Sequence, residues 1–491
     1  MMLAVPVLAA DAPRPNIVFI LADDLGYGDL ASYGATDIAT PNLDRLAHEG
    51  IRFTDFYSAG NTCSPSRAAL MTGRYPPRSG VNAVLFYDTP EGLPQSEITI
   101  AELLRDAGYQ TAMIGKWHLG SIDAFMPLNH GFDEFFGVPY SNDEKNFFLF
   151  DGHRQILDPV DLTQLTRLYT DRALAFLTRA AASDRPFFLY LAYNAPHTPL
   201  DPGPGFAGRS KRGTYGDVVE ELDASVGEIL ARIASLGIDE RTIVVFSSDN
   251  GPWLAMRDWA GSAGDLRGGK TGTFEGGHRV PALARWPGGI RPANEFHEIA
   301  TMMDWYPTLV ELAGARVPDD RVIDGRTLVP VLEGTGGREP TPFFYLSLRT
   351  PVLDELRHEV GAVRVGPWKL KRPRSGYPQF LEPYVRLEFA GHGQLLFDLK
   401  SDPGERHDVA AEHPDVVEQL TQEIERFDAS IQDEKPVRVD AAPRDTRGWE
   451  RLLRGVGVLA GAVFAAALLV LLTLIFAMRW IVKRRRRATA R

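Results

Sequence analysis

Cysteine is almost absent from this sequence, which has one, Cys63, in 491 residues. A single cysteine excludes an intrachain disulfide framework, so packing must hold the fold together. The composition allows this, because 44% of the residues are hydrophobic and 24% are charged, as in ordinary globular proteins. The length suits one large domain with a smaller one, or two comparable domains.

The body of the chain also lacks an excess of positive charge. The formal net charge is −11, although residues 483–487 are one lysine followed by four arginines. The rest of the chain is therefore more acidic than the total suggests. This balance argues against general nucleic-acid binding, which needs a basic surface, and we expect no nucleic-acid partner.

Charge is missing altogether from Val456 to Met478, a run of about 23 residues that is long enough to span a bilayer. The basic run follows at once, so the positive-inside rule places the C-terminus in the cytoplasm and the body outside. A buried core helix is the alternative, which the length and the flanking charge disfavour. We predict a polar linker over 432–454, a transmembrane helix over 455–479 and a basic cytoplasmic tail over 480–491.

The first residues lack the basic start of a signal peptide. "MLAVPVLAADA" nevertheless resembles the apolar part and the small-residue cleavage site of such a peptide, and we interpret residues 1–12 as a signal-peptide remnant. Together with the C-terminal span, this predicts a single-pass, membrane-anchored protein whose body is periplasmic or extracellular.

What the sequence does contain is an apolar run of strand length that recurs four times. These runs alternate with amphipathic stretches of helical period. The runs cover residues 16–24, 111–120, 186–199 and 242–251, and the predicted helices cover 41–50, 99–109, 165–181 and 216–237. Buried strands alternating with helices indicate an α/β domain with a large, mostly parallel sheet, which we place at 13–334.

Each of the four runs ends in polar residues that can bind ions or move protons. In open α/β sheets, ligands lie outside the carboxyl ends of the strands. A single aspartate after a strand is usually a turn residue or a helix cap, but recurrence at four strands favours one shared site. The sequence therefore predicts a crevice lined by Asp23, Asp24, Lys116, His118, His197, Asp249 and Asn250.

After about residue 334 the predicted secondary structure changes from alternating strands and helices to short strands with little helix between them. Residues 342–349, 358–373 and 393–405 read as short strands joined by proline and glycine turns, and 414–431 reads as a closing helix. We predict a smaller α+β subdomain with an antiparallel sheet over 335–431.

"GDLRGGKT", residues 264–271, matches the spacing of a nucleotide-binding phosphate loop. That motif works only between a strand and a helix whose N-terminus binds phosphate. The residues before it do not read as a buried strand, and those after it are too rich in glycine for a helix. We reject the phosphate loop but keep Lys270 as a candidate.

Cys63 begins "CSPSRAALMTG", which reads as a short helix with Pro65 in its first turn and Gly73 at its C-terminal end. Two interpretations follow from the residues alone. The cysteine is a small buried hydrophobe, or it is a thiolate nucleophile whose pKa is lowered by the helix N-terminus and by Arg67.

A resemblance adds a third interpretation. "CSPSRAALMTGR" resembles the signature of the type I, formylglycine-dependent sulfatase family of the alkaline phosphatase superfamily. "PNIVFILADDLGYGDLASYG", "GYQTAMIGKWHLG", "DRPFFLYLAYNAPHTP", "IVVFSSDNGP" and "GGKTGTFEGGHRVPALARWPG" follow the family's order, and the similarity covers about residues 15–430. "HGFDEFFGVPYS" and "GRSKRGTYGDVVEELDASVGEIL" are similar to the branch of arylsulfatase A and the N-acetylgalactosamine-6-sulfatases.

The resemblance implies a sulfuric ester hydrolase with an alkaline phosphatase-like fold. It implies that a formylglycine-generating enzyme oxidises Cys63 to formylglycine (3-oxoalanine), whose hydrate attacks the sulfur of a sulfate monoester. Aryl sulfates, sulfated sugars and sulfolipid head groups all stay open as substrates.

The resemblance also assigns roles to the site residues. It implies one divalent ion, usually calcium with magnesium as the alternative, held by Asp23, Asp24, Cys63, Asp249 and Asn250. Arg67 and Lys116 would stabilise the formylglycine hydroxyls, and His118 would remove a proton in the second step. His197 and Lys270 would bind the sulfate with Lys116 and protonate the leaving oxygen, and Asp249 would take the nucleophile's proton.

Other functions stay in view beside the sulfatase. A formylglycine-dependent phosphodiester or phosphonate hydrolase shares the nucleophile, and a membrane sulfotransferase or phosphotransferase shares the fold but uses threonine or serine. A catalytically silent, membrane-tethered binding protein is a further alternative. Three more residues have no assigned role: His278, for which a substrate contact and packing are equal alternatives, and His153 and Asp143, in a segment that often builds substrate pockets.

Overall fold

The structure, a computed structural model, describes residues 14–87, 89–144, 147–157, 160–347, 359–373 and 393–432. Its strands are β1 (Asn16–Ala22), β2 (Ile51–Phe53), β3 (Phe56–Tyr57), β4 (Gln110–Lys116), β5 (Glu134–Val138), β6 (Leu149–Asp151), β7 (Arg154–Leu157), β8 (Phe187–Ala192), β9 (Thr242–Ser248), β10 (Ala282–Arg285), β11 (Asn294–Phe296), β12 (Ala300–Thr301), β13 (Phe343–Ser347), β14 (Glu359–Val365), β15 (Trp368–Lys371) and β16 (Leu395–Asp398).

The α-helices of the described residues are α1 (Pro41–His48), α2 (Cys63–Thr72), α3 (Pro76–Ser79), α4 (Ile100–Asp106), α5 (Leu165–Ala181), α6 (Thr214–Ser235), α7 (Glu275–His278), α8 (Trp305–Leu312), α9 (Val329–Leu332) and α10 (Pro414–Gln432). Short 3-10 helices are η1 (Tyr27–Asp29), η2 (Ala31–Tyr33), η3 (Asp123–Phe125), η4 (Pro127–Asn129), η5 (Leu162–Gln164), η6 (Asp239–Arg241), η7 (Leu254–Trp259) and η8 (Met302–Asp304). The helices predicted from sequence period are all present.

Ten strands form one large sheet in the order β11-β2-β10-β9-β1-β8-β4-β5-β6-β7. The central strands β9, β1, β8, β4 and β5 are parallel to one another. Antiparallel pairs extend the sheet on both sides of this centre, through β10 and β2 on one side and through β6 and β7 on the other. The predicted α/β class is therefore confirmed, as a mixed sheet with a parallel centre.

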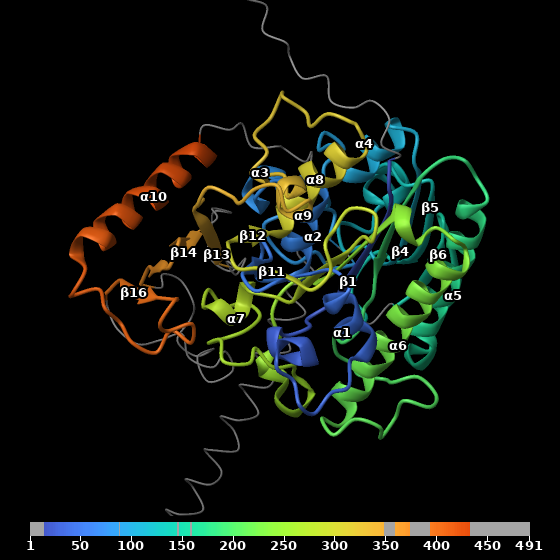
Figure 1. The fold of residues 1–491 in the computed structure, drawn as a ribbon, viewed down its shortest axis with the longest axis horizontal. Coiled ribbons are helices and arrows are strands. Elements are labelled where there is room, and N and C mark those ends of the chain that lie inside the picture. Colours follow the sequence, from blue (N-terminus) through green and yellow to red (C-terminus); the bar gives the residue numbers. More distant parts are fainter. Residues whose placement is uncertain are drawn as a thin grey trace, which may run out of the picture. The chain divides into compact units, whose positions relative to one another are not determined.

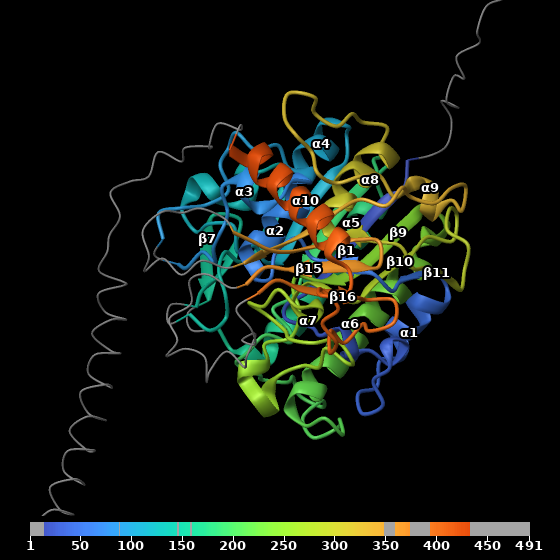
Figure 2. The ribbon, with the colours of Figure 1, turned by 90° about the vertical axis from the view of Figure 1, so that its left-hand side faces the viewer.

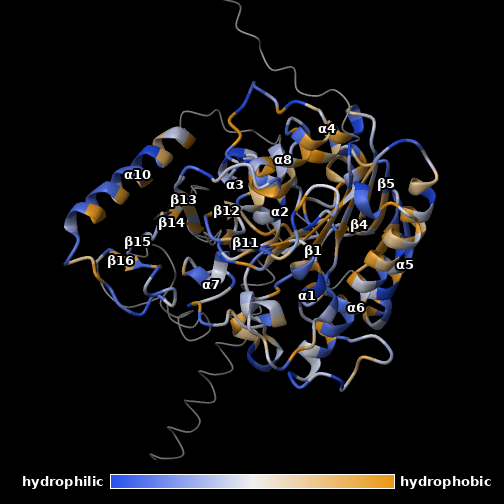
Figure 3. Cartoon of the chain, viewed as in Figure 1, coloured by the Kyte–Doolittle hydropathy of each residue, from blue (hydrophilic) through white to orange (hydrophobic). Residues whose placement is uncertain are grey.

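Strand β1 shows why the centre of the sheet is apolar on both faces. Its side chains alternate between two hydrophobic clusters, as successive residues of a strand must: Ile17, Phe19 and Leu21 face one, and Val18, Ile20 and Ala22 face the other. Helices α2, α4 and α8 cover the first face, and α1, α5 and α6 cover the second (Figure 1). Figure 3 shows the apolar residues gathered on the strands and on the helix sides that face them.

The C-terminal region forms the predicted antiparallel sheet, in the order β13-β14-β15-β16. Helix α10 packs against this sheet (Figure 2), with Leu420, Ile424 and Phe427 on its buried side. Tyr57 and Ala69 of the large domain belong to the same apolar cluster, so the small sheet is continuous in packing with helix α2. The domain boundary at residue 334 stays a prediction.

Several predictions concern segments outside the described residues: the leader over 1–12, most of the linker over 432–454, the transmembrane helix over 455–479 and the basic tail over 480–491. Among the helices that the structure describes, none combines the length and the apolarity that crossing a bilayer requires.

Candidate active site

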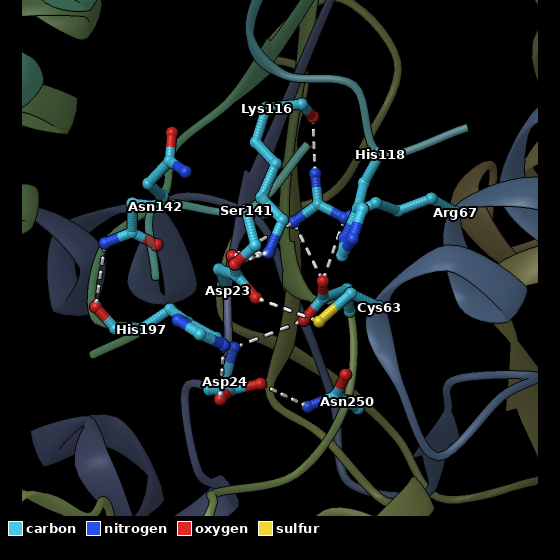
Figure 4. Close-up of polar contacts among 12 residues, drawn as sticks. Asp23, Asp24, Cys63, Arg67, Lys116, His118, Ser141, Asn142, His197 and Asn250 are labelled. Carbon is cyan, nitrogen blue, oxygen red and sulfur yellow. Dashed lines mark hydrogen bonds and ion pairs between the residues drawn. The ribbon is translucent and has the colours of Figure 1, made fainter. Parts of the chain in front are cut away.

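The predicted crevice lies at one edge of the parallel centre of the sheet. Strands β9, β1, β8 and β4 are neighbours in that order, so their carboxyl ends meet at the same edge. Each is followed by candidate residues: β1 by Asp23 and Asp24, β8 by His197, β9 by Asp249 and Asn250, and β4 by His118 after its last residue, Lys116. The structure brings these residues together (Figure 4).

Cys63 enters the same site from helix α2. It is the first residue of the helix, which ends as predicted at Gly73 in the left-handed conformation, with φ 69°. Cys63 is 2% exposed, and its Sγ lies 3.4 Å from Asp23 Oδ1 and 3.4 Å from Lys270 Nζ. The Cys63 sulfur is thus buried between a carboxylate and an ammonium group.

Three cations and three carboxylates form a cluster with balanced charges around Cys63. Lys116 Nζ donates to Asp23 Oδ2 at 2.5 Å, and Lys270 Nζ lies 2.7 Å from Asp24 Oδ1. Arg67 donates from Nε and Nη2 to Asp249 Oδ2 at 2.9 and 2.8 Å. Buried charges persist only when they are paired in this way.

The thiolate interpretation of Cys63 is wrong in the light of this geometry. Burial, followed by the charge of Asp23, raises the pKa of the Cys63 thiol well above its ordinary value, despite the opposing effect of Lys116 and Lys270. The Arg67 guanidinium, expected to stabilise a thiolate, donates instead to Asp249 and, from Nη1, to the Lys116 carbonyl at 2.6 Å. An unmodified Cys63 is therefore a protonated, poorly nucleophilic thiol.

Asp23 and Asp249 differ in the direction of their pKa shifts. Burial raises the pKa of Asp23, but Lys116, His197 and Arg67 outweigh it and hold that pKa well below its ordinary value. Burial and the neighbouring Asp23 charge raise the pKa of Asp249 to about 6, against the attraction of Arg67. The pKa values of two carboxylates in one site move apart in this way when one carboxylate experiences more of the nearby positive charge than the other.

His118 presents one free ring nitrogen. Its Nε2 lies 2.8 Å from the Leu85 carbonyl oxygen, which can only accept, so Nε2 carries the proton. Its Nδ1 is buried without a hydrogen-bond partner. Burial, followed by the charges of Lys116 and Arg67, holds the pKa of His118 well below its ordinary value. The residue is a neutral imidazole with an available lone pair.

The backbone of the next residue, Thr198, orients the His197 ring. Its Nδ1 lies 2.6 Å from the Thr198 carbonyl oxygen, and its Nε2 lies 3.6 Å from Asp24 Oδ2. Burial, followed by the charge of Lys270, lowers the pKa of His197. Nδ1 therefore carries a proton, and Nε2 faces the cluster.

The cluster fits a hard divalent cation. One ligand atom each of Asp23, Asp24, Cys63 and His197 lie within 4.8 Å of one another. The amide oxygen of Asn250 is buried without a hydrogen-bond partner, while its nitrogen donates to Asp24 Oδ1 at 2.7 Å. Carboxylate and amide oxygens are ligands of calcium and magnesium, so the donor set suits such an ion. The individual roles stay predictions.

His278 and His153 have polar partners outside this cluster, and Asp143 directly follows Asn142 in the chain. His278 is fully buried, 3.0 Å from the Ser58 carbonyl through Nδ1, and its ring packs against Tyr345, so its position fits packing. His153 Nδ1 lies 2.7 Å from Asp123 Oδ1, and its side chain is 53% exposed. Asp143 is exposed.

Sequence reasoning did not find three neighbours of the cluster. Ser141 Oγ accepts from Lys116 Nζ at 3.1 Å, Asn142 Nδ2 donates to the His197 carbonyl at 3.4 Å, and Trp253 packs against the His197 ring. Ser141 and Asn142 follow β5, the next parallel strand beside β4. Their signal was of the same kind as that of the other four strands, namely polar residues at or beyond the end of an apolar run.

Comparisons with known proteins agree with one another. The chain matches the family model described as Sulfatase over residues 15–315, and the model described as N-sulphoglucosamine sulphohydrolase, C-terminal, over residues 269–430. It is 42% identical to arylsulfatase A of Homo sapiens over 459 residues, which cover 86% of this chain and 89% of that protein. It is 38% identical to N-acetylgalactosamine-6-sulfatase of Canis lupus familiaris over 480 residues, 90% of this chain and 91% of that one. A solved sulfatase from Pseudoalteromonas sp. superposes with a TM-score of 0.77 at 26% identity, covering 87% of this chain and 92% of that chain.

Proposed function

Because the chain belongs to the sulfatase family and is a sulfuric ester hydrolase, we propose that it hydrolyses sulfate monoesters, of aryl or sugar alcohols, through a formylglycine made from Cys63. One observation carries the proposal. The single cysteine is buried among charge-paired cations and carboxylates, where its thiol is held protonated. A thiol in that state is a poor nucleophile, whereas an aldehyde hydrate at the same place offers two hydroxyl groups.

The Cys63 sulfur stands in for the hydroxyl oxygens of that hydrate. One hydroxyl attacks the sulfur of the ester, the bond from sulfur to the ester oxygen breaks, and the sulfate becomes attached to residue 63. Loss of the proton from the second hydroxyl then reforms the aldehyde and expels inorganic sulfate. Water restores the hydrate. A formylglycine-generating enzyme is the partner that this maturation requires.

The surrounding side chains supply charge and proton transfer. Lys116 and Arg67 stabilise the negative charge that develops on the oxygens during attack. Asp249, whose pKa is raised by burial, accepts the proton of the attacking hydroxyl. His118 Nδ1, buried with its lone pair available, accepts the proton of the second hydroxyl.

His197 and Lys270 act on the leaving group. Lys270 Nζ lies 3.4 Å from the Cys63 sulfur, so a sulfate held at residue 63 lies within its reach. Lys116, paired with the Asp23 carboxylate that contacts the same sulfur, would bind this sulfate with it. As the sulfur–oxygen bond breaks, its electron pair stays on the ester oxygen, which takes a proton from this pair.

A divalent ion, calcium or alternatively magnesium, would be held by Asp23, Asp24, Asp249, Asn250 and residue 63. When bound, it would polarise the sulfate and lower the pKa of a hydroxyl group beside it, as a Lewis acid does.

We also propose that the protein is anchored in a membrane by residues 455–479, with its body periplasmic or extracellular. The uncharged run and the basic residues after it support this. Fractionation of cells that express the full chain, or a chain ending at residue 454, tests it. Equal solubility of both would contradict the anchor.

The mass of residues 53–67, "FTDFYSAGNTCSPSR", tests the central proposal, because trypsin cleaves after Arg52 and Arg67. Protein made beside a formylglycine-generating enzyme should lose the sulfur and gain an oxygen in this peptide. It should also turn over p-nitrophenyl sulfate faster than p-nitrophenyl phosphate. Full sulfatase activity with an intact thiol would overturn the proposed nucleophile, and a preference for the phosphate would overturn the reaction class.

A further inference from the structure

Trp253 contacts both residues that the proposed function places at the leaving group. It follows Asn250 by three positions and its side chain is partly exposed. The indole ring centroid lies 5.6 Å from that of the His197 imidazole, with 38° between the ring planes. Lys270 Nζ lies 4.8 Å from the Trp253 ring centroid. An ammonium group over an indole is attracted by the ring's negative face, and tryptophan is the strongest such partner.

The backbone beside Trp253 fixes the loop that carries Lys270. The Lys270 amide donates to the Pro252 carbonyl at 2.9 Å. Gly269 packs so closely that a Cβ there would lie 2.4 Å from the Pro252 oxygen and 2.9 Å from Leu254 Cγ. Because neither contact leaves space, the loop is seated directly on residues 252–254.

His197 and Lys270 come from different parts of the chain, so their positions relative to each other depend on residues that contact both. His197 follows β8, and Lys270 lies in a loop without regular structure. Asp24 lies 2.7 Å from Lys270 Nζ and 3.6 Å from His197 Nε2, but one carboxylate leaves the long lysine side chain and the plane of the imidazole ring free to adopt several positions. The Trp253 indole contacts the imidazole and the ammonium at once, so it restricts both.

We propose that Trp253 is a positioning residue, which holds His197 and Lys270 in the geometry that protonates the departing ester oxygen. This inference rests on the proposed function. It predicts a specific kinetic signature, because proton donation matters most when the leaving oxygen is strongly basic. A basic leaving group cannot depart as a free anion, whereas a weakly basic one can.

The test compares Trp253→Leu and Trp253→Phe with the wild-type protein, each with residue 63 converted. The substrates are p-nitrophenyl, m-nitrophenyl and phenyl sulfate, whose leaving groups become progressively more basic. We expect Trp253→Leu to lose about tenfold in kcat on p-nitrophenyl sulfate and about 100-fold or more on phenyl sulfate. Trp253→Phe keeps an aromatic face and should stay within about threefold of wild type throughout. Trp259→Leu, at an indole that is 57% exposed on the same segment, is the matched control and should change nothing.

The kinetic results distinguish a failure of the positioning role of Trp253 from a failure of the proposed sulfatase activity. An unchanged rate in Trp253→Leu, or a loss that is the same for all three esters, would overturn the positioning role. A loss confined to KM would do the same, since it would indicate substrate binding only. If converted wild-type protein hydrolyses neither these aryl sulfates nor a sugar sulfate, the proposed function itself fails, and the inference fails with it.

Discussion

Arg67 and Asp249 form a fully buried ion pair, in which both Nε and Nη2 of the guanidinium donate to Asp249 Oδ2, at 2.9 and 2.8 Å. The third nitrogen, Nη1, donates to the Lys116 carbonyl. The guanidinium therefore connects the helix of Cys63 to the ends of two strands. Only a planar group with several donors can make these contacts together.

Replacing this guanidinium should damage catalysis even when the charge is kept. We expect Arg67→Lys to lower kcat/KM for p-nitrophenyl sulfate by about 100-fold, because an ammonium group cannot reach Asp249 and the Lys116 carbonyl together. Arg179→Lys, at an exposed side chain, is the control. Activity of Arg67→Lys within about threefold of wild type would show that charge alone suffices.

Metal removal should affect stability as well as activity. The unpartnered Asn250 amide oxygen is a ligand only when an ion is bound, and an ion that binds the folded state stabilises it by mass action. We expect EDTA to lower the melting temperature of the wild-type protein, and added calcium to restore it. Asn250→Ala should need at least about tenfold more calcium than wild type to restore the melting temperature to the same extent. The same calcium curve for Asn250→Ala as for Asn129→Ala, at an exposed asparagine, would exclude Asn250 as a ligand.

Asp223 should give the fold a measurable pH dependence. Its carboxylate accepts from the Asn42 and Leu43 amides at the start of α1, at 3.0 and 2.8 Å, and burial raises its pKa to about 6 against these hydrogen bonds. The folded state thus binds the proton more tightly than the unfolded chain, where the pKa is 3.8. The stability from this group is complete below pH 3.8 and is lost as pH rises through about 6.

Asp223→Asn should remove this dependence. We expect the free energy of unfolding of the variant, relative to wild type, to rise by up to about 3 kcal/mol between pH 4 and pH 7.5. Urea unfolding at both pH values measures it. Asp171→Asn, at a side chain that is 64% exposed, should show no such change. If the difference in unfolding free energy between Asp223→Asn and wild type is the same at both pH values, the Asp223 carboxyl has an ordinary pKa.

A second buried ion cluster connects the C-terminal sheet to helix α7. Lys369 Nζ of β15 lies 3.0 Å from Glu275 Oε1 and 2.8 Å from Glu405 Oε1, and all three side chains are fully buried. Lys369→Met would leave two carboxylates facing each other, at a cost of about 3–5 kcal/mol in the free energy of unfolding. Glu405→Gln in the same chain should recover part of that loss, because it removes one of the two charges. Urea unfolding near pH 8 measures both.

Lys400→Met is the matched control for this cluster, since Lys400 is exposed, and should stay within about 0.5 kcal/mol of wild type. If Lys369→Met also stays within that range, the cluster does not hold the C-terminal sheet to the large domain.

Local patterns in the sequence were sufficient for most of the fold and much of the candidate site. Apolar runs of strand length predict buried parallel strands, and the carboxyl ends of neighbouring parallel strands must meet. That geometry alone places Asp23, Lys116, His197 and Asp249 together. The start of α2 at Cys63 and its end at Gly73 were equally local, because proline and glycine act on the backbone of their own turn.

Tertiary structure decided what depends on distant neighbours. Lys270 lies in a loop without regular structure, and its position is fixed by the Pro252 carbonyl, the Trp253 ring and the Asp24 carboxylate. The direction of the Cys63 pKa shift reversed the local expectation, because desolvation and the charge of Asp23 outweigh the helix N-terminus and the neighbouring ammonium groups. A sequence pattern records which groups are near along the chain. Burial and charge pairing depend on which groups are near in space, and these decided which residues of the site can react.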